Sequence, residues 1–281
     1  MKLKFLSLII SVIILLTGCG DTSTSNSTPV NTNIMKVHYI DVGQGDSILV
    51  QVNGKNILID AGPGSSTDKL LAYLKKQNIS TLDYIVATHP HEDHIGGMAE
   101  VIKHYNVGEF YAPKVVTTTR TFQNMISALK GKGLKINTAK EGVTIDLGSN
   151  AECVMLAPNS SSYESLNNYS AVIKITFGNT KFLFTGDAEK LSEKEMLDKN
   201  LDLSADVLKV GHHGSTSSSS AAFLDKTAPK AAIISCGKGN DYGHPHKPTI
   251  TALTKRNIKI YRTDIDGTVI IESDGTNITR K

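Results

Sequence analysis

The chain contains no tryptophan, and only 6% of its 281 residues are aromatic. Extensive stacking on bases or sugars, which needs many exposed rings, is therefore not indicated. The formal charge is +3 and falls to +1 without Lys2 and Lys4, so no strong general attraction to nucleic acid is expected. Basic clusters such as residues 255–262 are interpreted as solvated helix faces.

Cysteine is also scarce, with three in the whole chain. Cys153 and Cys236 each lie beside apolar runs, so buried and unreactive thiols are the default interpretation. A disulfide between them is an alternative in an oxidising exterior, because sequence does not show whether they are close in space.

The first 18 residues have the layout of a secretory signal, with a short basic start and an apolar run over residues 5–16. The run ends in LTGC, which resembles a bacterial lipobox; the resemblance implies cleavage before Cys19 and a lipid on its thiol. The run is shorter than the ~20 residues that span a bilayer. A lipoprotein on the outer face of a bacterial membrane is therefore favoured over a transmembrane anchor.

Composition then changes twice along the chain. Residues 19–33 are rich in Ser, Thr and Asn and have almost nothing apolar, which predicts a flexible tether. Residues 34–281 are long enough to form one domain with a large core.

Apolar alternation and turn signals predict many short strands in this domain. We expect them at residues 37–42, 47–52, 56–60, 84–87, 109–112, 135–138, 143–147, 152–157, 171–177, 181–185, 205–210, 230–235, 258–261, 268–272 and 277–279. Helices alternate with some of them, and the strand at 135–138 is expected to begin the second half. The pattern predicts an α/β fold of two mixed β-sheets face to face, flanked by helices, with a site at their shared edge.

One stretch is hard to explain as packing. Residues 88–94 read THPHEDH directly after an apolar strand. His89 and His91 are two apart and point the same way from an extended segment, while Asp93 and His94 lie further on and can reach a second ion. Imidazole and carboxylate suit zinc, manganese or iron. The alternative is a polar loop that happens to be rich in histidine.

The pattern H-x-H-x-D-H after a strand resembles the metallo-β-lactamase superfamily of hydrolases, and the resemblance extends from about Lys36 to Lys281. It implies an αββα four-layer sandwich. Five segments narrow it to the hydrolase domain of ComEC-like DNA-uptake proteins and their free-standing secreted relatives, which include phosphorylcholine esterases. These segments are DVGQGD (41–46), THPHEDH (88–94), NYS (168–170), TGDAE (185–189) and LKVGHHGS (208–215).

The resemblance implies two divalent metal ions, with zinc first and manganese second. His89 and His91 would hold the first ion, and Asp93, His94 and His213 the second. Asp187, at the end of an apolar strand, would lie between them. Taken alone, Asp187 is more simply explained as the N-cap residue of a helix.

Other residues receive supporting roles from the same resemblance. Asp60 would orient a ligand histidine, and His212 would face the substrate phosphate. Asp93 or Asp187 would accept a proton from water. His246 would act at the substrate edge, for which the alternative is a solvated loop histidine.

The chain departs from the fuller superfamily pattern in one place. Many members have a third histidine for the first metal before the bridging aspartate, where this chain has Asn168 and Ser170. The departure argues against a true β-lactamase or a glyoxalase-type thioesterase.

We expect a phosphodiesterase or nuclease acting on DNA. The alternatives are a phosphocholine-type or other ester hydrolase, and a low-turnover surface lipoprotein that binds DNA or a partner.

Overall fold

The computed structural model describes residues 34–281. The expected signal, the lipidated Cys19 and the tether lie outside the described residues and stay predictions. Among residues 34–281, every helix is too short or too polar to cross a bilayer.

The first β-sheet has eight strands, antiparallel up to β3 and parallel from β3 to β6. In spatial order they are β15 (Ile278–Arg280), β14 (Val269–Ser273), β1 (Met35–Tyr39), β2 (Ile48–Val52), β3 (Lys55–Ile59), β4 (Thr81–Val86), β5 (Asn106–Ala112) and β6 (Ile136–Thr138).

The second β-sheet has seven strands, parallel from β13 to β10 and antiparallel from β10 to β7. In spatial order they are β13 (Lys259–Arg262), β12 (Ala231–Ile234), β11 (Val207–Lys209), β10 (Thr180–Phe184), β9 (Val172–Phe177), β8 (Ala151–Ala157) and β7 (Thr144–Asp146).

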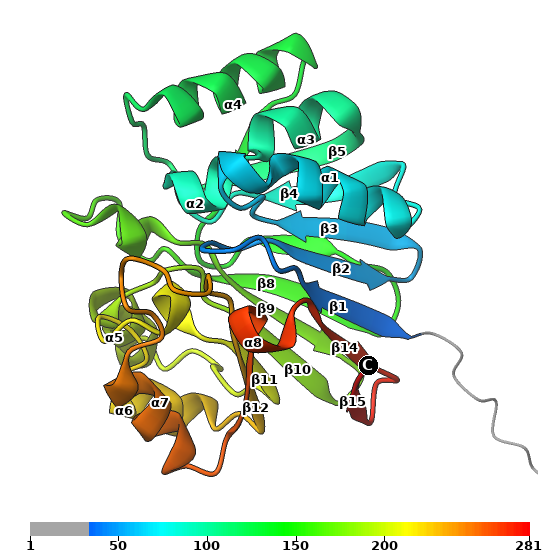
Figure 1. Ribbon diagram of the computed structural model, residues 1–281. Coiled ribbons are helices and arrows are strands. Elements are labelled where there is room, and N and C mark those ends of the chain that lie inside the picture. The colour runs from blue at the N-terminus through cyan, green and yellow to red at the C-terminus, as the bar shows by residue number, and fades with distance from the viewer. Residues whose placement is uncertain (1–33) are drawn as a thin grey trace, which may run out of the picture. The chain divides into compact units, whose positions relative to one another are not determined.

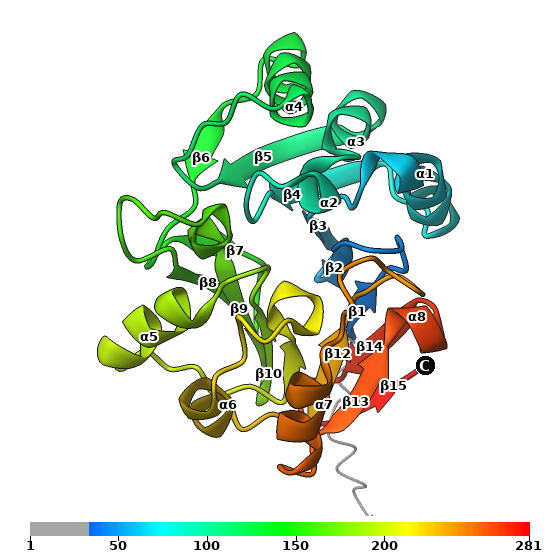
Figure 2. The same cartoon turned by 60° about the vertical axis from the view of Figure 1, so that its left-hand side comes forward.

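Helices cover the outer face of each sheet, as Figures 1 and 2 show. On the first sheet they are α1 (Thr67–Lys76), α3 (Met98–His104) and α4 (Arg120–Gly131), with the short α2 (Glu92–Ile95) at its edge. On the second they are α5 (Lys190–Asp198), α6 (Ala221–Thr227) and α7 (Lys247–Thr254). The four-residue helix α8 (Thr263–Asp266) connects β13 to β14.

The strands are apolar on both faces because both faces are covered. In β2 and β3, Val50 and Ile57 point into the core between the sheets, whereas Leu49 and Leu58 point outward beneath the helices. Each of these four side chains is at most 1% exposed. Burying one such side chain stabilises the fold by about 1.5–3 kcal/mol.

The expected two-sheet architecture is confirmed, with differences in detail. The strand expected to open the second half, β6, pairs instead with β5 in the first sheet. The closing strands β14 and β15 also return to the first sheet, where β14 pairs with β1. A single-turn helix, α2, forms ahead of α3 and was not among the elements expected from the sequence.

The two cysteines of the described domain do not form a disulfide. Cys153 and Cys236 are free and buried. Burial raises the pKa of both thiols to about 12, so the default interpretation as buried thiols is confirmed.

Candidate metal centre

The candidate residues lie where strands of both sheets end. Asp60 follows β3, His89 follows β4, Asp187 follows β10 and His212 follows β11. In each sheet the two strands concerned run parallel as neighbours, so their carboxyl ends meet at one edge. The loops leaving the two sheets therefore face each other across a shared edge.

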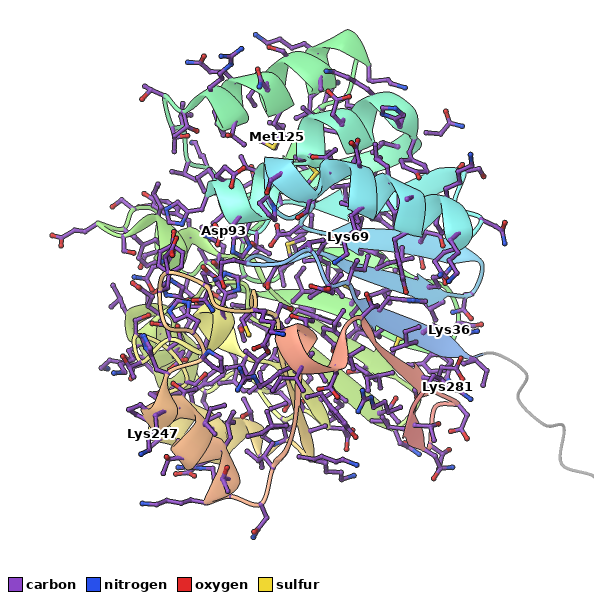
Figure 3. All side chains as sticks on the ribbon, in the orientation of Figure 1. Lys36, Lys69, Asp93, Met125, Lys247 and Lys281 are labelled. Atoms are coloured by element: carbon purple, nitrogen blue, oxygen red, sulfur yellow. The ribbon has the colours of Figure 1, made fainter. Side chains whose placement is uncertain are left out.

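Helix α2 presents the central part of the THPHEDH motif. His91 has extended backbone and precedes the helix, which carries Asp93 and His94 in its single turn. The turn before β2 packs directly against it, since Asp46 N donates to Asp93 O at 3.1 Å. A Cβ on Gly45 would lie 2.2 Å from the same carbonyl oxygen, so this position requires glycine. Figure 3 shows Asp93 on the side where the loops of the two sheets meet.

A first group of side chains is formed by His89, His91 and Asp187. The distance from His89 Nε2 to His91 Nδ1 is 3.0 Å. The distance from His89 Nε2 to Asp187 Oδ2 is 3.8 Å. Two imidazoles and one carboxylate oxygen from different sheets thus face one another.

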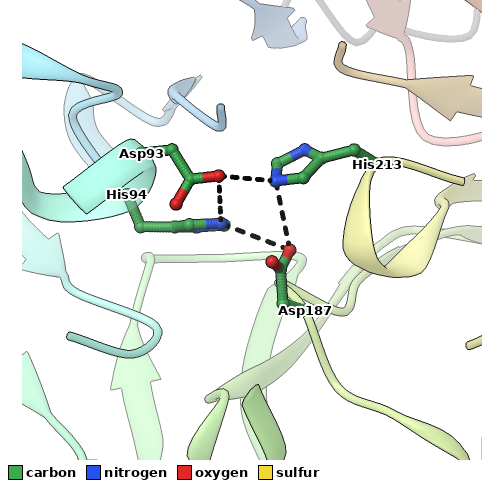
Figure 4. A group of neighbouring side chains, drawn as sticks. All are labelled: Asp93, His94, Asp187 and His213. Atoms are coloured by element: carbon green, nitrogen blue, oxygen red, sulfur yellow. Dashed lines mark hydrogen bonds and ion pairs between the residues drawn. The ribbon is translucent and has the colours of Figure 1, made fainter. Parts of the chain in front are cut away.

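A second group contains Asp93, His94, Asp187 and His213, whose ligand atoms all lie within 4.8 Å of one another. His213 Nε2 lies 3.2 Å from Asp93 Oδ2, and His94 Nε2 lies 3.2 Å from Asp187 Oδ1. Figure 4 shows the four side chains converging from α2 and from the loops after β10 and β11.

Asp187 lies between the two groups. Its Oδ1 faces His94 at 3.2 Å and His213 at 3.5 Å. Its Oδ2 faces His89 at 3.8 Å and His212 at 3.7 Å. One carboxylate therefore presents an oxygen to each side, as a bridging ligand does, and His212 adds an imidazole on the side of the first group.

The second group fits a divalent cation. His94 Nε2 and Asp187 Oδ1 are buried and, among the described residues, neither makes a hydrogen bond, although the two atoms lie 3.2 Å apart as an ion pair. Burial would lower the pKa of His213, but Asp187, Asp46 and Asp93 outweigh it and raise the pKa to about 10. The carboxylates thus favour positive charge at this point. Imidazole and carboxylate are also the ligand types that divalent transition metals take.

Asp60 orients the His94 ring through the ring nitrogen that faces away from the cluster. Its Oδ2 lies 2.7 Å from His94 Nδ1, which leaves Nε2 to face the cluster. The Thr88 hydroxyl also donates to Oδ2 at 2.6 Å, and Thr88 N donates to Oδ1 at 2.8 Å. Both carboxylate oxygens are therefore used in fixing the start of the motif.

His213 is supported by a buried ion pair that joins the sheets. Its Nδ1 lies 2.9 Å from Ser235 O and 3.4 Å from Asp46 Oδ1. Asp46 Oδ2 pairs with Lys209 Nζ at 2.7 Å, and both side chains are at most 2% exposed. Burial raises the pKa of Asp46, but Lys209 and His213 outweigh it and lower the pKa to about 2. Asp46 and Lys209 had no role assigned from sequence. The one indication of this pair was the charged Lys209 inside the apolar run at 207–210.

The two histidines of this loop have unusual backbone. His212 and His213 have φ values of 49° and 53°, in the left-handed region that side chains normally avoid. Such conformations cost about 1–3 kcal/mol each and occur where a functional geometry requires them. The turn lets consecutive side chains reach different sides of Asp187. His212 Nδ1 lies 2.8 Å from Ser217 Oγ, which leaves its Nε2 toward the carboxylate.

Asn168 and Ser170 have different surroundings. Ser170 Oγ accepts from Asp187 N at 3.0 Å and lies 3.4 Å from His89 Nδ1, so it touches the centre. Asn168 Oδ1 instead accepts from Glu189 N and Ser192 N at the start of α5. Asn168 is thus bonded to the helix rather than to a histidine of the cluster.

His246 also differs from its expected position at the substrate edge. Its Nδ1 accepts from Thr216 N at 3.1 Å, and its Nε2 lies 3.2 Å from Tyr242 O. Both ring nitrogens therefore contact backbone groups, and the expected role of His246 in catalysis stays a prediction. Its neighbour His244 lines the pocket instead.

An open pocket of about 310 Å³ gives access to the centre. Its lining is mostly polar and combines residues from both sheets: Gln44, His91, Glu92, Asp93, Asp187, His212, His213, Tyr242 and His244. A substrate in this pocket would lie against Asp187 and both groups of histidines.

Comparison with known proteins shows the family of this chain. The profile of the metallo-beta-lactamase superfamily matches residues 40–238. The chain belongs to the metallo-beta-lactamase superfamily. It is an enzyme with the metallo-hydrolase fold of that superfamily, and its cluster of histidines and aspartates indicates divalent metal ions.

Two curated relatives resemble most of this chain. ComE operon protein 3 of Bacillus subtilis is 34% identical over 252 residues, covering 83% of this chain and 32% of the relative. Recombination protein 2 of Haemophilus influenzae is 30% identical over 242 residues, covering 83% of this chain and 28% of the relative. The chain thus spans about a third of the length of these relatives.

A solved structure supports the fold. The metallo-beta-lactamase fold protein YhfI from Bacillus subtilis superimposes with a TM-score of 0.57 at 14% identity. The match covers 85% of this chain and all of YhfI. The four-layer arrangement expected from the sequence is therefore that of a known fold.

Proposed function

We propose that the chain is a metal-dependent phosphodiesterase that hydrolyses DNA at the outer surface of a bacterial cell. The observation that carries the proposal is the position of Asp187, with one oxygen toward His94 and His213 and the other toward His89 and His212. This arrangement suits two divalent ions, for which zinc is the first choice and manganese the second.

The ligand roles follow the two groups. His89 and His91 would hold one ion, Asp93, His94 and His213 the other, and Asp187 would serve both. Bound there, the ions would lower the pKa of water to near neutrality and offset the charge that develops on a phosphoryl group.

The chain's own residues supply the remaining chemistry. Asp93, on the pocket wall, is placed to accept a proton from the attacking water. His212, 23% exposed in its side chain, faces the pocket and can donate to a phosphoryl oxygen through Nε2. Asp60 and Ser170 keep His94 and His89 in position.

DNA is proposed as the substrate because of the resemblance to ComEC-like DNA-uptake proteins and because one relative, of which this chain covers 28%, is named for recombination. Fold alone does not determine substrate. A phosphocholine-type ester is the competing substrate within the same chemistry, and the assay below separates the two.

The test is hydrolysis by purified protein with added Zn²⁺ or Mn²⁺, together with metal content. We expect cleavage of bis(p-nitrophenyl) phosphate and single-stranded DNA, and no cleavage of nitrocefin or p-nitrophenyl phosphorylcholine. Loss of a supporting contact to a metal ligand alone costs 10–100-fold, so His94→Ala with Asp187→Ala should lower the rate by at least about a hundredfold. His104→Ala, an exposed histidine on α3, is the matched control. Hydrolysis that survives the double change contradicts the metal-centred mechanism.

The surface location has its own experiment. If Cys19 carries a lipid, Cys19→Ser should move the protein from the membrane fraction to the soluble fraction. Unchanged fractionation would contradict the lipoprotein proposal.

A further inference from the structure

The loop of residues 237–246, between β12 and α7, forms one rim of the pocket, and the Asn240 side chain makes four hydrogen bonds within it. Asn240 Nδ2 donates to Gly237 O at 2.9 Å and to His244 O at 2.6 Å. Asn240 Oδ1 accepts from Tyr242 N at 3.2 Å and from His244 N at 3.0 Å. These four bonds fix the backbone that carries Tyr242 and His244, so the rim is formed before a substrate arrives.

The same loop is attached to both walls of the metal centre. On one side, His246 N donates to Gly214 O at 3.0 Å, directly after the ligand His213. On the other, Gly237 N donates to Gln44 Oε1 at 3.1 Å. The contact is close enough that a Cβ on Gly214 would lie 2.6 Å from Pro245 Cβ. The position of the rim relative to the centre is therefore fixed.

Tyr242 is the feature of this rim that packing does not explain. It is 67% exposed and lines the pocket together with Asp93 and Asp187. The other large apolar side chains that are exposed within residues 34–281 do not line this pocket. Its ring stacks on His244, with centroids 5.5 Å apart and planes 16° apart. The aromatic ring of Tyr242 thus lies at the pocket that leads to the centre.

Two polar atoms of residues that line this pocket lack hydrogen-bond partners among the described residues. Gln44 Nε2 and His244 Nδ1 are both buried and make no hydrogen bond, although both residues line the pocket. A buried donor without a partner is costly, and an anionic oxygen of a ligand would satisfy it. The rim therefore combines an apolar ring with groups that can bind an oxyanion.

We propose that Tyr242 stacks on an unpaired nucleobase next to the scissile phosphodiester, while Gln44 and His244 bind a phosphate oxygen. The proposal rests on the proposed function and narrows its substrate to single-stranded nucleic acid. A base inside a duplex already has both faces stacked, whereas a base in a single strand has a face free for an aromatic ring. One ring at a fixed position is also consistent with a chain that is poor in aromatic residues.

Binding tests the proposal independently of turnover. The probe is a fluorescein-labelled phosphorothioate oligothymidine, with the full chain, Mn²⁺ and anisotropy as the readout. Stacking on one aromatic side chain changes affinity by about 5- to 150-fold, so Tyr242→Ala should raise Kd by that factor. Tyr242→Phe keeps the ring and should restore most of the affinity. Ile265→Ala, 69% exposed on α8 and outside the pocket lining, is the control and should leave Kd unchanged.

An oligomer without bases distinguishes stacking from a general structural effect. Tyr242→Ala should not weaken binding of an abasic oligomer of the same length. Equal losses on both oligomers, or an unchanged Kd for oligothymidine, would overturn the proposal. If wild-type protein binds oligothymidine in this way but cleaves no phosphodiester, the proposed function fails while the stacking site stands.

Discussion

The space between the two sheets has an apolar interior and a charged edge, and both are buried. In the interior, side chains such as Tyr39, Phe182 and Phe184 are 0% exposed and contact other apolar groups. At the edge, Asp60 and Lys209 are equally buried. Apolar burial stabilises the interior directly, whereas a buried charge is tolerated only with a partner.

The difference shows how the fold can keep a polar centre without losing stability. Two buried carboxylates at the edge are paired across elements: Asp60 with His94, and Asp46 with Lys209. The second pair joins the turn before β2 to the end of β11, and so links the sheets beside the candidate metal ligands. The stability of the interior should therefore depend on side-chain volume, and that of the edge on whether each charge keeps its partner.

The largest expected effect comes from breaking that pair. Lys209→Met leaves Asp46 buried without its cation, which should lower the free energy of unfolding by about 3–5 kcal/mol. Urea unfolding measures it. Lys209→Met with Asp46→Asn removes both charges and should recover part of the loss. A double variant that loses the sum of the single losses would show that pairing is not what stabilises the edge.

His38 tests whether burial of a polar group matters away from the centre. It is 2% exposed on β1 and contacts Tyr73 and Gln51. Burial lowers the pKa of His38 from 6.5 to about 4. The unfolded chain therefore takes up the proton first as pH falls, and stability should decrease from about pH 6.5 to about pH 4, by on the order of 3 kcal/mol.

Unfolding by urea at pH 7 and pH 5 in wild type and His38→Gln measures this contribution. The wild type should lose more stability than the variant over that interval. The same pH dependence in both proteins would contradict the assignment to His38.

Asp60→Asn probes the edge without changing its packing volume. An amide holds the His94 ring less well than a carboxylate, so metal affinity should fall by about 10–100-fold. Competition with a chelating dye gives the affinity. Asp68→Asn, on the exposed start of α1, is the matched control. Affinity within twofold of wild type for Asp60→Asn would mean that His94 needs no anionic support.

The smallest effect is expected in the interior. The Tyr39 hydroxyl is buried and has no hydrogen-bond partner among the described residues. Tyr39→Phe removes it while keeping the ring beside Phe184, so stability should stay unchanged or rise by up to about 1 kcal/mol. A thermal melt measures it. A loss greater than about 1 kcal/mol would reveal a partner for this hydroxyl and weaken the contrast between interior and edge.

Most of the fold could be predicted because local patterns set it. Strands such as β2 and β3 can be recognised by apolar residues on both faces and by the Asn53-Gly54 turn. The sheet that each strand joins could not be predicted in the same way. The segment that forms β6 has three exposed residues, so no apolar pattern indicated its partner β5.

The candidate site divides along similar lines. His89, His91, Asp93 and His94 could be recognised because four ligand-type side chains occupy six consecutive positions. The buried pair of Asp46 and Lys209 could not, because its partners are far apart in sequence. A lysine next to a loop reads as a solvated residue until the opposite sheet is in place.

The sequence by itself determined the type of chemistry, since imidazole and carboxylate at this spacing select divalent metals whatever surrounds them. Tertiary structure alone decided which of these groups lie together and which face the pocket. It turned Asp187 so that its two oxygens face different histidines, bonded Asn168 to α5, and left Tyr242 exposed while fixing His246. The reason is physical: ligand type is a property of one residue, whereas burial, orientation and pairing arise only where two sheets meet.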